Sequence, residues 1–176
     1  MKEINDTESL QPEEVHAFVD EVTQAIMDGA TYKDIHGIPQ STMDGLYAYA
    51  YEFYQQGKLA EAETFFRFLS IYDFYNTDYV MGLAAVYQLT RRYEKAAELY
   101  TLAFFLAKND YRPLFYAGQC NLMLKKSSAA LHCFESTFNS SNDPELKKKS
   151  AAYLEALRKN LVQPETEPEE PSEKAL

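Results

Sequence analysis

The amino-acid sequence predicts an all-α fold in which three similar helix hairpins form a short right-handed solenoid. One N-terminal helix precedes the hairpins and one C-terminal capping helix follows them. Two observations predict this fold. Small, aromatic and aliphatic residues recur in fixed columns every 34 residues, and a short polar turn falls near the middle of each interval. A repeat of roughly 20–50 residues indicates stacked hairpins, because one hairpin alone cannot bury its apolar face.

Each interval contains an alanine that is followed four residues later by an aromatic ring. A small residue lies twelve positions before the alanine and an aliphatic residue sixteen before it. The columns are Ala62, Ala96 and Ala130; Phe66, Tyr100 and Phe134; Ala50, Ala84 and Gly118; and Leu46, Val80 and Leu114. A 34-residue period with these columns is the signature of the tetratricopeptide repeat. The small residues let the two helices of a hairpin approach closely, and the rings fill the seam to the next hairpin.

The segment before the repeats is expected to hold one helix and a connector. Residues 1–11 are polar and are expected to be a flexible N-terminus. Within residues 12–40, Pro12 and the acids after it favour a helix start, and Gly29 favours its end. The apolar stripe of this helix has no partner helix of its own, so it must pack against the solenoid or a second copy of the chain. It is formed by Val15, Phe18, Val19, Val22 and Ile26.

The repeats are expected to occupy residues 41–144, with units at 43–76, 77–110 and 111–144. Ser41 and Asp44 have the spacing of a capping box at the start of the first unit. Within residues 145–161 the apolar residues recur with a helical period. This segment is expected to form a helix that caps the last hairpin. The remaining residues, 162–176, are rich in Pro and Glu and are expected to be a disordered acidic tail.

Composition and charge exclude several classes of function. The net charge of −10 argues against direct nucleic-acid binding, which needs clustered Lys and Arg. No apolar stretch approaches the ~20 residues of a membrane span, and the first residues do not resemble a secretion signal. With only two cysteines, Cys120 and Cys133, the chain fits a reducing compartment, and we expect a cytoplasmic protein.

Catalytic chemistry has no evident place in the sequence. His16, His36 and His132 are scattered, without the paired spacing of metal ligands. The sequence contains no glycine-rich phosphate loop and no nucleophile elbow. The two cysteines are expected to be small core residues. We therefore expect no enzyme activity, no metal and no cofactor.

A binding surface is predicted on the first helix of each hairpin. In a repeat of this kind, the second, fifth, ninth and twelfth residues face the concave side. In the first repeat three of these positions hold Tyr47, Tyr51 and Tyr54. Tyrosine offers large contact area at low entropy cost, and its hydroxyl can bond an extended peptide. The other candidates are Asp78, Met81, Ala85, Gln88, Arg112, Phe115 and Gln119. The alternative is that the tyrosines only cover neighbouring helices.

Several long segments resemble the class II translocator chaperones of bacterial type III secretion systems, and within that family the Salmonella pathogenicity-island-1 type. These segments are Gly29–Gln40, Met43–Tyr54, Glu61–Leu69, Ile71–Asn76, Met81–Ala85 and Lys108–Pro113. The resemblance covers roughly residues 15–158.

The resemblance implies a cytoplasmic, all-helical chaperone that binds two hydrophobic translocator proteins before secretion. It also implies that an extended client segment lies in the concave groove, against Tyr47, Tyr51 and Tyr54, and that the client stays soluble and secretion-competent. A homodimer through the N-terminal helix is implied as well, as is assistance to an AraC-like transcription activator in some members.

Two alternatives stay open, the first suggested by the repeat architecture and the second only by the resemblance. One is a general scaffold that binds folded proteins through its convex face or its tail. The other is a regulatory subunit of a transcription activator. The sequence does not reveal which translocators are bound.

Overall fold

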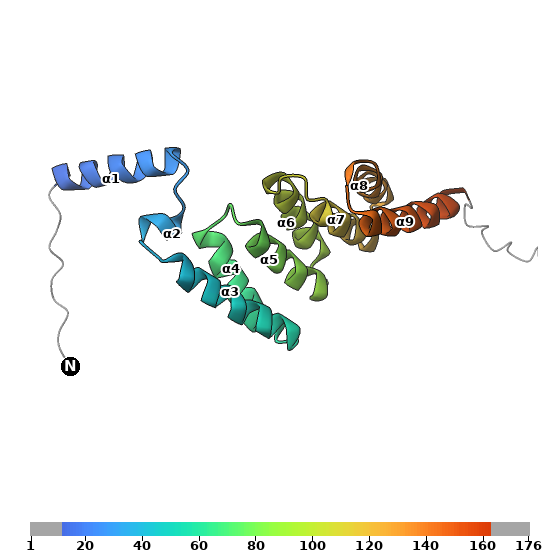
Figure 1. Ribbon diagram of the computed structural model, residues 1–176, viewed down its shortest axis with the longest axis horizontal. Coiled ribbons are helices and arrows are strands. Elements are labelled where there is room, and N and C mark those ends of the chain that lie inside the picture. The colour runs from blue at the N-terminus through green and yellow to red at the C-terminus, as the bar shows by residue number, and fades with distance from the viewer. Residues whose placement is uncertain (1–11, 163–176) are drawn as a thin grey trace, which may run out of the picture. The chain divides into compact units, whose positions relative to one another are not determined.

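The structure, a computed structural model, describes the backbone of residues 12–162 and the side chains of residues 19–159. Every regular element in this part of the chain is a helix, which confirms the predicted all-α class (Figure 1). The helices are α1 (Pro12–Met27), α2 (Tyr32–Ile35), α3 (Gln40–Gln55), α4 (Leu59–Tyr72), α5 (Thr77–Leu89), α6 (Tyr93–Leu106), α7 (Arg112–Met123), α8 (Ser127–Ser140) and α9 (Pro144–Val162). The expected flexible N-terminus and acidic tail lie outside the described residues, except that Val162 ends α9.

The hairpin turns repeat the same backbone conformation. Between α3 and α4, α5 and α6, and α7 and α8, one residue has a positive φ: Gly57 (73°), Arg91 (60°) and Lys125 (58°). These residues are 34 positions apart, so the sequence repeat is also a repeat of backbone geometry. Glycine adopts this conformation without strain, whereas arginine and lysine do not.

A basic residue follows each turn position. These residues are Lys58, Arg92 and Lys126. In the first hairpin Lys58 Nζ lies 5.7 Å from the ring centroid of Phe53, and in the second Arg92 Cζ lies 4.1 Å from that of Tyr87. Both are cation–π contacts across the turn. The third hairpin has Asn121 where the others have the ring, and its side chain lies 4.0 Å from Cys133 Sγ.

The chain divides into two compact units, Met1–Tyr79 and Val80–Leu176. In the first unit, α3 packs along α4 (Figure 1). Ala50 and Ala62 are fully buried, which confirms that small residues let these helices approach. The buried core of this hairpin consists of Met43, Ala50, Ala62, Phe66 and Leu69.

The predicted capping box at Ser41 and Asp44 is wrong. Helix α3 begins at Gln40, so Ser41 already lies inside the first turn, and Asp44 accepts a hydrogen bond from Gln40 Nε2 at 2.8 Å. A capping box is found at α2 instead. There the backbone N–H and the hydroxyl of Thr31 donate to Asp34 Oδ2 at 2.9 and 2.7 Å. The backbone N–H of Thr31, followed by its hydroxyl, lowers the pKa of Asp34.

An ion pair ties the connector to the end of α4. Lys33 Nζ donates to Asp73 Oδ2 at 3.2 Å and to Gln40 Oε1 at 3.1 Å. Burial acts to lower the pKa of the Lys33 ammonium, but the hydrogen bond and the charge of Asp73 outweigh it and raise that pKa. The pair therefore holds α2 against α4.

The second unit has two core clusters, and α9 completes the second of them. The first contains Ala84, Ala96, Tyr100, Leu114, Ala117, Cys120 and Cys133. The second contains Phe115, Ala130, Phe134, Leu146, Leu154 and Leu157. Because α9 supplies the three leucines of the second cluster, this helix covers the apolar face of the α7–α8 hairpin. Both cysteines are buried core residues, as predicted.

Candidate functional site

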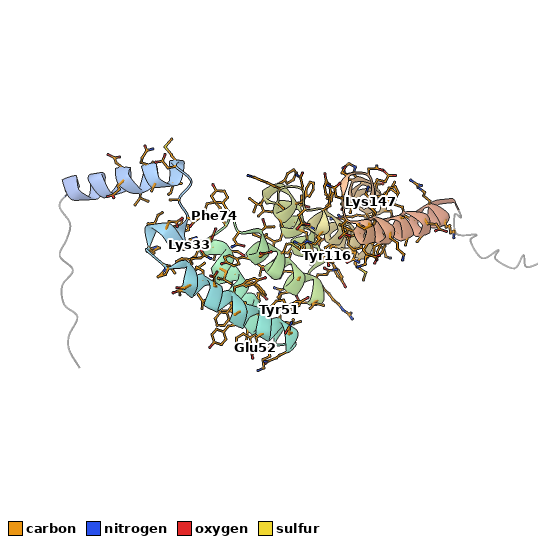
Figure 2. The ribbon with its side chains drawn as sticks, viewed as in Figure 1. Lys33, Tyr51, Glu52, Phe74, Tyr116 and Lys147 are labelled. Atoms are coloured by element: carbon orange, nitrogen blue, oxygen red, sulfur yellow. The ribbon has the colours of Figure 1, made fainter. Side chains whose placement is uncertain are left out.

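Three tyrosines form a stack of rings along one face of α3. The ring centroids of Tyr47 and Tyr51 are 6.5 Å apart, and those of Tyr51 and Tyr54 are 6.4 Å apart, with interplanar angles of 21° in both pairs. Spacings of four and three residues place the side chains on one helical face. Tyr51 is 48% exposed and projects from α3 (Figure 2), whereas Tyr47 and Tyr54 are half-buried. We call these three residues the tyrosine stripe.

The core of the first unit supports one end of the tyrosine stripe. The ring of Tyr47 meets Phe66 edge-on at 6.0 Å and lies 5.6 Å from the ring of Tyr79. Phe66 and Tyr79 are 2% and 3% exposed. Burial raises the pKa of the Tyr79 hydroxyl, a hydrogen bond with Gln40 opposes this, and the Asp44 carboxylate adds to the rise. A stripe anchored in this way loses little conformational freedom when it binds a ligand.

The other predicted residues differ in accessibility. Asp78 and Arg112 are exposed, and Met81 and Ala85 are half-buried. Burial acts to raise the pKa of Asp110, but hydrogen bonds from Arg112 outweigh it and lower that pKa. The shortest of these bonds runs from Arg112 Nη2 to Asp110 Oδ2, at 2.6 Å.

Phe115 is more deeply buried than a binding residue needs to be. It is 4% exposed, and its ring meets the rings of Phe134 and Tyr153 edge-on, both at 5.6 Å. The buried ring of Phe115 therefore packs against the ring of Tyr153 and holds it in place. Tyr153, on α9, was not among the predicted binding residues. It lies 34 positions after Gln119, and thus at the ninth position of a further unit that starts at residue 145.

Gln88 and Gln119, both predicted for the binding surface, are in contact. Gln88 Nε2 donates to Gln119 Oε1 at 3.3 Å, and Gln119 Nε2 donates to the Tyr153 hydroxyl at 2.9 Å. The Tyr100 hydroxyl donates to Gln88 Oε1 at 2.9 Å. The repeat positions thus bring together amide groups of two successive hairpins, with a phenol on α9.

The cysteines and histidines offer no catalytic or metal-binding arrangement in the described part of the chain. Among these residues, no three His, Cys, Asp or Glu side chains are close enough together to hold a metal ion. His36 lies 5.9 Å from the ring of Tyr72. Burial raises the pKa of the Cys120 thiol to about 12 and also raises that of Cys133, so neither is an activated nucleophile. None of the described helices has the length and apolar character that a bilayer crossing requires.

Comparison with known proteins agrees with this architecture. A family model for the tetratricopeptide repeat matches residues 43–76 and 77–110. The chaperone protein SicA of Salmonella typhimurium is 59% identical over 137 residues, which cover 78% of this chain and 83% of SicA. The crystal structure of PcrH, a Pseudomonas aeruginosa protein, with the chaperone-binding region of PopD has a TM-score of 0.68 and 30% identity, and covers 71% of this chain and 97% of that one.

A further solved structure is the type III secretion chaperone SycD of Yersinia enterocolitica with a peptide of the translocator YopD. It has a TM-score of 0.65 and 26% identity, and covers 70% of this chain and 98% of that one. Hairpins with a 34-residue period and buried alanine columns define a tetratricopeptide-repeat protein. Within that class, the chain belongs to the translocator-chaperone family of type III secretion systems, the family of SicA.

Proposed function

We propose that this protein is a cytoplasmic, non-enzymatic chaperone that binds two hydrophobic translocator proteins and keeps them soluble and secretion-competent. An extended client segment binds through the surfaces that the repeat positions assign to the concave face, and the tyrosine stripe is the main contact. The observation that carries this proposal is the stack of Tyr47, Tyr51 and Tyr54, whose rings pack on one another but remain partly accessible. PcrH and SycD, with their bound PopD and YopD segments, support it.

The energetics favour modest affinity for a short motif. An apolar client side chain that becomes buried on the stripe contributes about 1.5–3 kcal/mol. Lost translational and rotational freedom removes much of the sum. The remaining candidates, Asp78, Met81, Ala85, Arg112 and Phe115, then shape and orient the binding surface, with the buried Phe115 acting through its support of Tyr153.

The test is coexpression with the hydrophobic translocators of the organism that encodes this chain. Wild-type protein should copurify with a soluble translocator, and Tyr51→Ala should weaken the complex about tenfold, because one ring contact is lost. Tyr49→Ala is the matched control, since Tyr49 is a 59% exposed tyrosine on another face of α3. Failure of every translocator to copurify with the wild type, or equal effects of the two variants, would contradict the proposal.

The apolar face of α1 is the proposed homodimer interface. Val19 and Ile26 are each 51% exposed, and Val22 is half-buried. Val15 and Phe18 belong to the same stripe, and their side chains lie outside those that the structure describes. Next to this face is an apolar pocket lined by Ile26, Ala30, Tyr32, Ile35 and Phe74. SycD has been crystallised in an alternative dimer, which supports self-association in this family.

Light scattering after size exclusion tests the dimer. The double variant Val19→Glu/Ile26→Glu should elute as a monomer, because charge on both residues opposes burial of the face. Gln24→Glu, at an exposed position on the opposite face of α1, should stay dimeric. A wild-type protein that is monomeric at micromolar concentration would overturn the proposal.

Assistance to an AraC-like activator remains a prediction of the family resemblance, and a reporter assay with and without the activator tests it.

A further inference from the structure

Four polar side chains of the second unit form one continuous line of hydrogen bonds. The line runs from Tyr100 through Gln88 and Gln119 to Tyr153, with donor–acceptor distances of 2.9, 3.3 and 2.9 Å. It connects α6, α5, α7 and α9 in that order. Tyr100 is 2% exposed, so the end of the line at Gln88 is anchored in the core. Both carboxamide planes are therefore held in place before any ligand arrives.

This line leaves hydrogen-bonding capacity at both carboxamides. A carboxamide has two N–H donors and an oxygen that accepts two bonds. The line uses one donor and one acceptor site on each glutamine, and no other residue with a described side chain bonds to the remaining sites. Gln88 and Gln119 are half-buried. A hydrogen bond to a half-buried amide is electrostatically stronger than one formed in bulk water. A partner that bonds to the open sites is therefore favourable.

We propose that Gln88 and Gln119 hold the main chain of the extended client segment, a proposal that rests on the translocator-chaperone function above. A carboxamide presents one donor and one acceptor side by side, which complements the N–H and C=O of a peptide residue. Ala85 lies one helical turn before Gln88, and Phe115 one turn before Gln119, so apolar residues share the faces of both amides. The pair therefore sets where the client main chain lies, independently of the client side chains.

The experiment uses the translocator that copurifies with the wild-type protein. Peptides tiled along it identify the segment that binds, by fluorescence anisotropy. The glutamine variants are Gln88→Met and Gln119→Met, which keep the length of the side chain and remove its amide. Each should bind the segment about two- to tenfold more weakly, as expected for the loss of one or two hydrogen bonds. Asn139→Met, at an exposed position on α8, is the control and should bind like the wild type.

A main-chain contact is distinguished from a side-chain contact by ester substitution in the peptide. Replacing single peptide bonds by esters removes one N–H at a time. One ester should weaken binding to the wild type about two- to tenfold and have no further effect on Gln119→Met. If one Asn or Gln side chain of the peptide accounts for this coupling instead, the main-chain proposal is overturned.

Folding and the parent function are controlled separately. Gln119→Glu keeps the shape of the side chain and can accept a hydrogen bond from Tyr153, so it is the second variant if Gln119→Met melts early. It too should bind more weakly, because the amide donor is gone. Unchanged affinity of both Gln119 variants overturns this inference alone. Absence of any translocator complex with the wild type overturns the proposed function itself.

Discussion

The ring of Phe134 lies directly against the bare backbone of Gly118. A Cβ atom on Gly118 would come within 2.8 Å of Phe134 Cε1 and within 3.1 Å of Cys133 Cβ. The ring has little room to retreat, because it stacks on Tyr153 with centroids 4.6 Å apart and an interplanar angle of 8°. Gly118 therefore sets the spacing between α7 and α8.

Gly118→Ala should lower the free energy of unfolding by about 1–2 kcal/mol. Overpacking costs about 1–3 kcal/mol, and the higher helix propensity of alanine offsets up to about 1 kcal/mol. Gly45→Ala is the matched control, since Gly45 is also inside a helix but nothing lies within 4 Å of its added Cβ. This second variant should be more stable than the wild type by up to about 1 kcal/mol. Urea unfolding followed by circular dichroism measures both, and effects of the same sign would contradict the packing argument.

Glycine at the second and third hairpin turns should stabilise the protein. Arg91→Gly and Lys125→Gly each relieve a left-handed backbone conformation that costs a non-glycine residue about 1–2 kcal/mol. Part of the gain is lost to the greater freedom of glycine in the unfolded chain, so we expect up to about 1 kcal/mol. Gly57→Ala should show the opposite sign. Thermal unfolding compares the three variants, and a loss of stability in both glycine variants would count against this account.

Ser150→Ala should raise stability by about 1 kcal/mol. Its hydroxyl is buried, and no described residue accepts or donates a hydrogen bond to it. Removing an unsatisfied buried polar group removes its desolvation penalty. Thr137→Val provides the contrast, because the fully buried Thr137 hydroxyl donates to the Cys133 carbonyl at 2.8 Å. That change should be destabilising or neutral. A less stable Ser150→Ala variant, measured by urea unfolding, would show that the hydroxyl has a partner.

Stability should fall at alkaline pH because of Cys120. Burial raises the pKa of its thiol from an ordinary value of 9.0 to about 12. Above pH 9 the unfolded chain loses this proton while the folded chain keeps it. The stability that the folded chain has relative to the unfolded chain at this thiol is therefore complete below pH 9 and lost by about pH 12. Urea unfolding between pH 8 and pH 11 should show a weaker pH dependence for Cys120→Ala than for the wild type. Identical slopes would contradict the assignment to this thiol.

The alanine and aromatic columns are what made the fold predictable from the sequence. A pattern with a period of 34 residues determines which positions are small and which are large, and Ala62, Ala96 and Ala130 are all fully buried. The tyrosine stripe followed from the same periodicity, because residues four and three apart share a helical face. Local chemistry was less reliable. Ser41 and Asp44 have capping-box spacing, but Pro39 places the helix start earlier.

The polar contacts between hairpins could not be derived from the sequence. Nothing in the spacing of Gln88 and Gln119 indicates that their amides meet, since that depends on how two helices are offset along their axes. The burial of Phe115 depends on Tyr153, which lies beyond the last repeat. Counting one further 34-residue interval would have placed Tyr153 in the same column as Tyr51 and Gln119.

The third hairpin turn is the least reinforced of the three. The first has a glycine and one cation–π contact, the second has two cation–π contacts to Tyr87, and the third has neither feature. Resistance to local opening should therefore be lowest at the third turn, because each contact adds to the work of separating the two helices. Lys125 and Lys126 make the weakest turn a cleavage site for trypsin, so limited digestion of the native chain should cut there before it cuts at either earlier turn.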